Sequence, residues 1–419
     1  MIVEIAIFLF YLLLACFLLT KINFFSNSGI GKWTLMGLMT AKIAAGIAYA
    51  KFYRLPKYYE GSDTWRFYRL SVEETKWLLK SPLAFIKDLF VHGYSAPGNI
   101  LGTQNSYWND LKSNVPVKIM AVMNLLTRNS YYTNIILFNF LFLFGLVALF
   151  RLFIGLFPEK KSLIIIGLFL LPSTLFWCSG IHKDGLILSA SGLLIYSFYK
   201  GLNSRFAPRH LLCIIVCALL IFSLRNYVLF AFVPALTAWW LSHKFSNRSL
   251  LVFGSVYLLG TVLFFALPYF VPSVDFALYL SLKQKDFLLL QAGSVVHFPD
   301  LEPTFPGFVR FLPYALDMAF LRPHFSEIKN LSYVPAFAEI ILFFLLIVIA
   351  AFSTHKQTTV TGRPFMFFLF FFSISILLIC GYTVPFSGAI VRYRSFVLPF
   401  LFTPLLCMSW NRQVKISFK

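Results

Sequence analysis

Long apolar runs alternate with short polar interruptions along most of this chain. A helix of about 20 residues crosses the hydrocarbon layer of a bilayer, although shorter runs also occur. Eleven runs fit this pattern, near residues 2–20, 33–50, 131–150, 162–178, 185–200, 210–224, 227–242, 249–270, 335–352, 364–382 and 395–410. The predicted fold is therefore all-α, a polytopic bundle of about eleven transmembrane helices that forms a single integral membrane domain over residues 1–419.

The run near 33–50 is rich in small residues, with Ala41, Ala44, Ala45 and Gly46 close together. Small side chains let two helices approach closely inside a membrane. We therefore expect this span to pack tightly against its neighbours.

Two connections are much longer than the others, at about 51–130 and about 271–334. Both have too many apolar residues for a disordered linker. Apolar and polar positions alternate with a helical period inside them, which is typical of helices that lie on a membrane surface. In the second segment the pattern predicts helices near 275–292 and 307–320.

The first long segment carries two helix-start signals. Ser71 with Glu74 forms a capping-box pattern, which predicts a helix that begins there and runs through Lys80. Ser81-Pro82 places an N-cap residue before a proline that suits the first helical position, so a second helix is predicted from there to about residue 90.

Composition supports lipid rather than water as the surrounding solvent. Apolar residues make up 59% of the chain and charged residues only 12%, too few to cover the surface of a soluble protein of this size. The net charge of +20 does not indicate nucleic-acid binding, because the basic residues occur in twos and threes between apolar runs. The six cysteines have no metal-type spacing and are interpreted as buried thiols.

The basic residues predict an orientation. Short connections on the cytoplasmic side of a membrane carry an excess of Lys and Arg. With the N-terminus outside, the inner connections and the tail collect Lys21, Lys32, Arg151, Lys160, Lys161, Lys200, Arg205, Arg209, Lys244, Arg248, Lys356, Arg363, Arg412, Lys415 and Lys419, against one acid, Glu159. The C-terminus is then cytoplasmic, and both long segments are outer segments.

Asp63 is the first candidate for chemistry, in the stretch Gly61-Ser62-Asp63-Thr64 of the first outer segment. An Asp beside Gly and Ser is common in turns and helix caps. A carboxylate at this place could also act as a general base or bind a divalent metal ion. Both interpretations stay open from the sequence.

The connection between the fourth and fifth predicted spans contains His182, Lys183 and Asp184. These two spans are short, so the connection is expected below the outer surface, inside a cavity. Ionisable residues there are costly unless they are paired or functional. The group is either a structural ion-pair network or a site in which Lys183 binds phosphate while His182 or Asp184 transfers protons or binds metal.

Arg225 and Asn226 interrupt a long apolar stretch from 211 to 242. Basic residues flank both ends of that stretch, so it must be a hairpin, with Arg225 at its tip and at membrane depth. Arg225 could snorkel to the interface or form a structural pair, or it could clamp a phosphate or pyrophosphate group.

Two basic and aromatic clusters complete the candidates. Arg322-Pro323-His324-Phe325 lies late in the second outer segment, and Arg392-Tyr393-Arg394 opens the last predicted span. Basic residues at span ends are often interfacial anchors. On the outer side they go against the usual charge bias, so an anionic substrate is an alternative partner.

The four places together suggest an anionic lipid-linked substrate. Arg and Lys would hold its phosphate, and a carboxylate would activate a hydroxyl group. With this layout the chain resembles the GT-C superfamily of bacterial polytopic glycosyltransferases, which use polyprenyl-linked sugars, and the related O-antigen polymerases. Asp63 is similar to the acidic residue in the first large outer loop of GT-C enzymes, and Arg392-Tyr393-Arg394 through Pro399 is similar to an Arg-Tyr pair that starts a late span.

The resemblance implies a membrane glycosyltransferase in the bacterial inner membrane. It would move a sugar from a polyprenyl-phosphate or -diphosphate donor to a lipid, glycan or protein acceptor on the non-cytoplasmic side. Asp63 would be catalytic, and the substrate-binding residues would be Lys183, Arg225, Arg322, Arg392, Arg394, Tyr393, His182 and Asp184. The cofactor is unknown, with a divalent metal ion as one option, and the partners are the polyprenyl-linked sugar and membrane lipid.

Two other functions compete with sugar transfer. An O-antigen or exopolysaccharide polymerase would use the same kind of substrate but transfer a whole oligosaccharide chain. A transporter of a lipid-linked substrate would be expected to carry charged residues at mid-span on both sides and an internal repeat. The ionisable residues of this chain cluster instead at the predicted outer ends of spans.

Overall fold

The computed structural model describes residues 2–101, 106–290, 294–328, 331–352 and 362–409. Over these residues the regular structure is helical, and the only β pairing is an isolated bridge between Val295 and Phe386. The all-α prediction is confirmed. Lys356, Arg412, Lys415 and Lys419 of the predicted inner connections lie outside the described residues.

The helices of the first part of the chain lead from the N-terminus to the end of the fourth predicted span. Their bounds are α1 (Ile2–Lys21), α2 (Asn23–Ser26), α3 (Lys32–Phe52), α4 (Pro56–Tyr59), α5 (Asp63–Lys80), α6 (Pro82–Lys87), α7 (Tyr107–Thr127), α8 (Tyr131–Leu156), α9 (Lys161–Phe169) and α10 (Pro172–Trp177).

The second part contains nine further α-helices and a short π-helical turn. Their bounds are α11 (Lys183–Asn203), α12 (Pro208–Lys244), α13 (Ser249–Phe270), α14 (Phe276–Leu288), α15 (Phe305–Leu316), the turn η3 (Asp317–Leu321), α16 (Val334–Phe352), α17 (Arg363–Thr383), α18 (Ser387–Ser395) and α19 (Leu398–Ser409).

Helices α8 and α11 form the centre of the bundle and are mostly buried, whereas α1, α13 and α16 expose most of their apolar side chains. Exposed apolar faces are what lipid contact requires. The central pair can approach closely because Gly145 has no side chain. A Cβ atom at this position would lie 2.2 Å from the Ser189 carbonyl oxygen. Gly46 of α3 also allows a close approach, because a Cβ atom on it would lie 2.5 Å from the Ser179 carbonyl oxygen. This agrees with the tight packing that its small neighbours predicted.

Eight helices in the described part of the chain are long and apolar enough to cross a membrane, or nine if the bent pair α18–α19 forms one span. The difference from eleven arises at three places. Helix α12 counts once although it was predicted as two spans, α9 and α10 are separate short helices, and α18–α19 is bent by 69°. The number of about eleven transmembrane helices therefore stays a prediction.

Helix α12 folds back on itself, as the sequence predicted for a hairpin. Its backbone is non-helical at Arg225, with φ −151° and ψ 88°. Arg225 pairs with Asp184 at the start of α11, whereas the rings of both Phe206 and Trp239 lie within 5.5 Å of Phe198, near the end of α11. The two arms of α12 thus run along α11 in opposite directions, and Arg225 is at the tip.

Two predicted spans are broken. The prediction of one continuous helix over 162–178 is wrong, because α9 ends at Phe169 and α10 begins at Pro172, which has no N–H group to continue a helix. The last span was predicted to open at Arg392-Tyr393-Arg394. Those residues instead end α18, and the chain bends before α19, whose second residue is Pro399.

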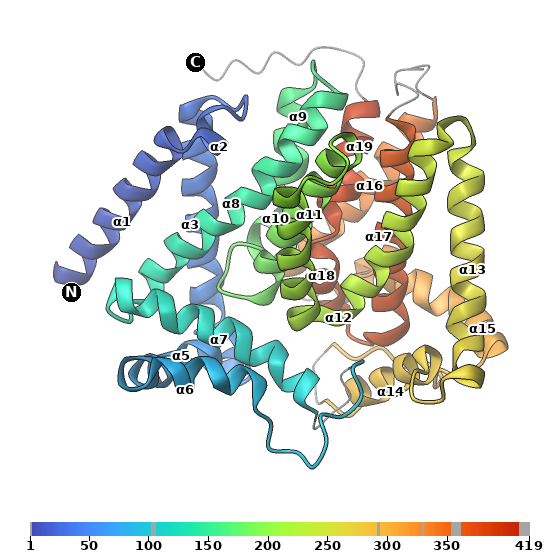
Figure 1. Cartoon of the computed structure of the whole chain (residues 1–419), viewed down its shortest axis with the longest axis horizontal. Coiled ribbons are helices and arrows are strands. Elements are labelled where there is room, and N and C mark those ends of the chain that lie inside the picture. The colour runs from blue at the N-terminus through green and yellow to red at the C-terminus, as the bar shows by residue number, and fades with distance from the viewer. Residues whose placement is uncertain (1, 102–105, 291–293, 329–330, 353–361, 410–419) are drawn as a thin grey trace.

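The two long segments lie together at one end of the bundle, along the lower edge of Figure 1, where α5–α7 and α14–α15 are seen. The predicted helix start at Ser71 is wrong: α5 begins eight residues earlier, and Ser71 is buried inside it with its hydroxyl donating to the Tyr68 carbonyl. The predicted start at Pro82 is confirmed, and α14 and α15 lie where the second segment's pattern indicated helices.

The short basic connections that are described lie at the opposite end. Figure 1 shows the turns around α2, before α9 and between α12 and α13 along the upper edge. The chain therefore separates its long segments from its short basic connections, as the charge pattern indicated. Which end faces the cytoplasm stays a prediction from the charge bias.

Candidate functional site

Five charged or titratable side chains that were predicted separately meet at the end of the bundle near the long segments. They are Asp63 of α5, His182 and Asp184 at the start of α11, Arg225 of α12 and Arg392 of α18. Their contacts form one continuous network of hydrogen bonds and ion pairs. We call these five residues the central cluster.

Asp63 is positioned by the anchoring of α5 against α8. It is the first residue of α5, where a carboxylate interacts favourably with the helix dipole. The next two residues are buried: the Thr64 hydroxyl lies 2.5 Å from the Tyr131 hydroxyl, and the Trp65 ring stacks on Tyr131 with ring centres 4.2 Å apart. The Trp65 N–H also donates to the Ala50 carbonyl of α3 at 3.2 Å. These contacts hold the Asp63 carboxylate at the bundle.

The connection before α11 is fixed by polar groups from two neighbouring helices. The Lys42 ammonium of α3 donates to the Cys178 carbonyl at 3.1 Å and to the Ser179 hydroxyl at 2.8 Å. The Asn139 amide of α8 donates to the Ser179 carbonyl at 2.8 Å. Otherwise unpaired backbone groups are satisfied in this way, which lets the connection that leads to His182 be buried, as the sequence indicated.

Two arginines balance the buried carboxylate. Arg225 Nη2 lies 2.5 Å from Asp184 Oδ1, and Arg392 Nε donates to Asp184 Oδ2 at 3.2 Å. Arg392 also donates through Nη2 to Asp63 Oδ2 at 3.0 Å. The Arg225 guanidinium lies over the Tyr393 ring, 4.5 Å from its centre, so Tyr393 contributes a cation–π contact. A buried carboxylate is tolerated when it is paired in this way.

His182 lies between the two carboxylates. Its Nδ1 is 2.7 Å from Asp184 Oδ2, and its Nε2 is 3.2 Å from Asp63 Oδ2 and in contact with Arg392 Nη2. A neutral ring would donate from Nδ1 and accept from Arg392, whereas a protonated ring would donate to both carboxylates. His182 therefore links the two carboxylates of the central cluster.

The carboxylate that a substrate can reach is Asp63. Its side chain is 30% exposed, whereas that of Asp184 is fully buried. Burial alone would raise the pKa of Asp63, but the hydrogen bond with His182 and the charges of Arg392 and Lys183 hold that pKa well below its usual value. Asp63 is thus ionised throughout the physiological pH range.

Lys183 is half-buried beside the central cluster. Its ammonium lies over the Phe67 ring, 5.6 Å from the ring centre, and that ring stacks on His182. Phe67 is one turn beyond Asp63 on α5, so Lys183 faces the same helix as the exposed carboxylate.

Arg322 and Arg394 were also predicted to bind substrate, but the structure places them apart from the central cluster. Arg322 forms ion pairs with Asp317 at 2.7 Å and with Glu327 at 2.6 Å, and His324 lies 2.8 Å from the other oxygen of Asp317. The guanidinium of Arg322 is thus held by two carboxylates of its own segment, and this network ties the start of η3 to the turn that follows it.

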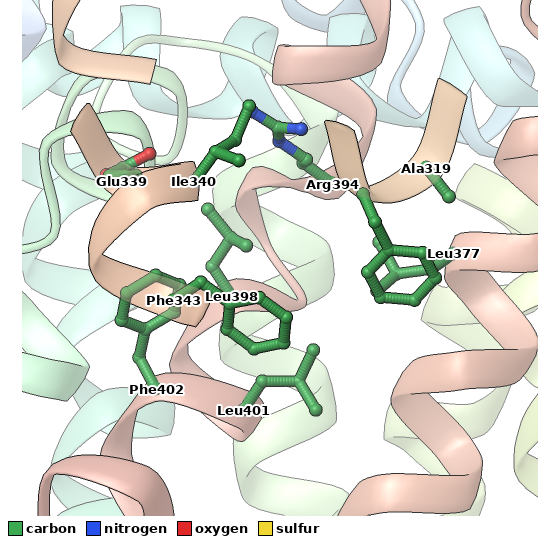
Figure 2. A pocket seen from close by; sticks show the side chains of 10 residues that line it. Ala319, Glu339, Ile340, Phe343, Leu377, Arg394, Leu398, Leu401 and Phe402 are labelled. Carbon is green, nitrogen blue, oxygen red and sulfur yellow. The ribbon is translucent and has the colours of Figure 1, made fainter. Parts of the chain in front are cut away.

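Arg394 points into a separate pocket with apolar walls. Figure 2 shows it with Glu339 among the side chains of α16, α17 and α19. The cavity has a volume of about 20 Å³, enough for about one water molecule and too small for a sugar or a lipid tail. Arg394 Nη1 donates to the Arg322 carbonyl at 2.6 Å, and its Nε and Nη2 have no hydrogen-bond partner in the described part of the chain.

Sequence reasoning missed Lys42, which supports the site from inside a span. Its position in an apolar run was a usable signal, because a charged residue within a span is costly unless it has a partner. It also missed Lys112 of α7 and Lys283 of α14, which no local motif distinguishes from the other lysines of the long segments.

No group of three or more His, Cys, Asp or Glu side chains in the described ranges is arranged to hold a metal ion. The carboxylate oxygens of the central cluster face guanidinium and imidazole groups instead. Comparisons with protein-family models, with curated proteins and with solved structures found no match to this chain.

Proposed function

We propose that the protein is a membrane glycosyltransferase that moves a sugar from a polyprenyl-phosphate or -diphosphate donor to an acceptor hydroxyl. The observation that carries the proposal is the convergence of Asp63, His182, Asp184, Arg225 and Arg392 from four helices far apart in sequence. A partly exposed carboxylate beside guanidinium groups suits a reaction in which a hydroxyl loses a proton and a phosphate group leaves.

In this proposal Asp63 accepts the proton of the acceptor hydroxyl as the new glycosidic bond forms. Its low pKa makes it a weak base at rest, but the hydroxyl becomes more acidic as its oxygen bonds to the sugar. Arg392 and Lys183 stabilise the departing phosphate oxygen, and Asp184 and Arg225 hold His182 and Arg392 in place.

The first long segment supports a lipid-linked donor. Leu79, Leu83, Ile86 and Phe90, on α5, α6 and the turn after it, are 53–75% exposed. Exposed apolar side chains next to Lys76, Lys80 and Lys87 are typical of helices on a membrane surface. Such helices would lie where the isoprenoid tail of the donor leaves the site.

The test compares Asp63→Asn with Glu73→Gln, which changes an exposed carboxylate on the same helix that pairs with Lys76. Each purified variant is reconstituted with a panel of radiolabelled polyprenyl-linked sugars and envelope acceptors, and labelled product is measured. We expect a loss of about 100-fold or more for Asp63→Asn and wild-type rates for Glu73→Gln. Full activity of a well-folded Asp63→Asn protein would refute the proposed role.

The same assay separates the competing functions. Addition of one sugar supports a single-sugar transferase, and growth of the product by whole repeat units supports a polymerase. Movement of a labelled lipid-linked sugar across the vesicle membrane without a new covalent bond would support a transporter instead.

A further inference from the structure

Two helices of the long segments bring lysines toward the central cluster. Lys112 lies on α7 one turn after Trp108, whose ring packs against Phe222 with centres 5.6 Å apart. Phe222 precedes the tip of the α12 hairpin by three residues. The half-buried Lys112 side chain is therefore beside the end of α12 that carries Arg225.

Lys283 approaches from α14. It lies between Tyr279, which bonds to Asn226 next to Arg225, and Phe287, whose ring centre is 6.0 Å from that of Tyr393. Its ammonium is 3.6 Å from Asp286 on the same helix. Lys283 therefore lies on the part of α14 that is close to Asn226 and Tyr393.

The charges of Lys183 and Lys283 act on the ammonium group of Lys112. Burial lowers the pKa of Lys112 to about 7, together with the positive charges of Lys283, Lys183 and Arg225. Lys112 belongs to α7, outside the candidate membrane spans. Such mutual repulsion is unfavourable in the free protein, so an anion between these groups would relieve it.

The charges of the central cluster leave these lysines unbalanced. Asp63 and Asp184 are matched by Arg225 and Arg392. The negative charge of Asp286 offsets the positive charge of Lys283. Neither Lys112 nor Lys183 forms an ion pair with a carboxylate in the described residues. When Lys112 and Lys183 are both protonated, an excess of about two positive charges remains. A sugar linked through one phosphate carries about one negative charge, and a sugar linked through a diphosphate carries about two.

We propose that Lys112, Lys183 and Lys283 form a diphosphate-binding subsite beside Asp63 and Arg392, so that the donor is a diphosphate-linked rather than a monophosphate-linked sugar. This inference rests on the proposed function and specifies its donor. Lys112 and Lys183 neutralise the diphosphate, and Lys283 closes the subsite from α14. In the transfer step the acceptor oxygen forms a bond to the sugar's anomeric carbon as the bond between that carbon and the diphosphate oxygen breaks. The diphosphate oxygen keeps the electron pair, and the acceptor proton goes to Asp63.

The binding test uses the full-length protein in detergent, with inorganic pyrophosphate as the probe and inorganic phosphate as the comparison. Affinity is measured by calorimetry for wild type, Lys112→Gln, Lys283→Gln and the charge-keeping Lys112→Arg. Lys285→Gln is the matched control. Lys285 is on the same helix as Lys283, but its side chain is exposed and lies 3.9 Å from the exposed carboxylate of Asp300.

We expect pyrophosphate to bind wild type at least tenfold more tightly than phosphate does. Each of Lys112→Gln and Lys283→Gln should weaken pyrophosphate about tenfold, and Lys112→Arg and Lys285→Gln should stay near wild type. Equal affinities for the two anions, or pyrophosphate binding unchanged in Lys112→Gln, would overturn the subsite.

Failure of the subsite and failure of the proposed function are distinguishable. Pyrophosphate binding that depends on both lysines, with no sugar transfer from any donor, keeps the anion subsite and rejects its assignment to a glycosyl donor. Transfer from monophosphate-linked sugars that is unchanged in Lys112→Gln and Lys283→Gln keeps the transferase and rejects the diphosphate donor.

Discussion

Arg392 and Arg394 are two residues apart on one short helix, yet they belong to different environments. Arg392 donates to Asp63 and Asp184 in the central cluster and keeps 20% of its side chain exposed. Arg394 is 3% exposed and faces the small pocket with Glu339. Residues two apart on a helix point about 200° from each other, so adjacent positions in a motif can reach opposite sides of α18.

The difference shows that a basic motif does not define a site. Arg392 pairs with carboxylates from two other helices, Asp63 and Asp184. The carboxylate of Asp63 is partly exposed. Arg394 donates to the Arg322 carbonyl, and Arg322 pairs with two carboxylates of its own segment. Variants of Asp184, Arg392 and Arg394 test whether this division between a chemical cluster and a structural one is correct, and a variant of Lys112 tests the anion subsite beside the chemical cluster.

The largest effect is expected for Asp184→Asn. The change removes the fully buried carboxylate between Arg225 and Arg392, so that Arg225 loses its carboxylate partner and Arg392 keeps only its contact with Asp63 among the carboxylates of the central cluster. Breaking a buried ion pair in this way costs about 3–5 kcal/mol. Unfolding in detergent should show this loss, while Asp300→Asn, which changes an exposed carboxylate, should shift stability by less than about 0.5 kcal/mol. A stability equal to that of wild type would mean that the central cluster is not a tight network.

Arg392→Met should abolish most sugar transfer with a smaller effect on folding. Loss of one preorganised charge at a developing negative charge lowers kcat by about 100-fold or more. Arg392→Lys should restore only part of the rate, because an ammonium cannot donate to Asp63 and Asp184 with the fixed geometry of a guanidinium. An unchanged kcat in Arg392→Met would show that Arg392, like Arg394, has a structural role only.

The third prediction concerns pH. Lys112 has a pKa of about 7 in the folded protein against 10.5 ordinarily, so the free site loses this charge as the pH rises through 7. Pyrophosphate should therefore bind wild type about tenfold more tightly than Lys112→Gln at pH 6, with a smaller difference at pH 9. Comparing the two proteins at each pH removes the titration of the probe itself. A difference that grows with pH would contradict the placement of Lys112 near Lys183, Lys283 and Arg225.

The smallest effect is expected for Arg394→Met. Replacing a buried, incompletely hydrogen-bonded guanidinium by an apolar side chain is often neutral or stabilising. The free energy of unfolding should stay within about 1 kcal/mol of wild type, and the rate of sugar transfer should not change. A large loss of transfer with normal folding would show that the division between Arg392 and Arg394 is wrong.

The positions of most helices and the separation of long segments from basic connections could be predicted because both depend on local composition. A long run of apolar residues must lie in lipid or against other apolar side chains wherever it occurs in the chain. Lys and Arg favour the cytoplasmic side for the connection in which they lie. The hairpin at Arg225 followed from the same argument. Breaks near Pro172 and before Pro399 were missed, since the apolar pattern continues through both.

The sequence by itself determined that the chain is a helical membrane protein and that its unusual charges gather near the ends of its helices. Only the tertiary structure decided which of those charges meet, because that choice depends on the helix that packs beside each residue and on the face that it presents. Asp63 and Arg392 are 329 residues apart and in contact, whereas Arg392 and Arg394 are two residues apart and face different environments. No periodicity along the chain encodes either outcome, so Lys42, Lys112 and Lys283 could be assigned to the site only from the packing of α3, α7 and α14.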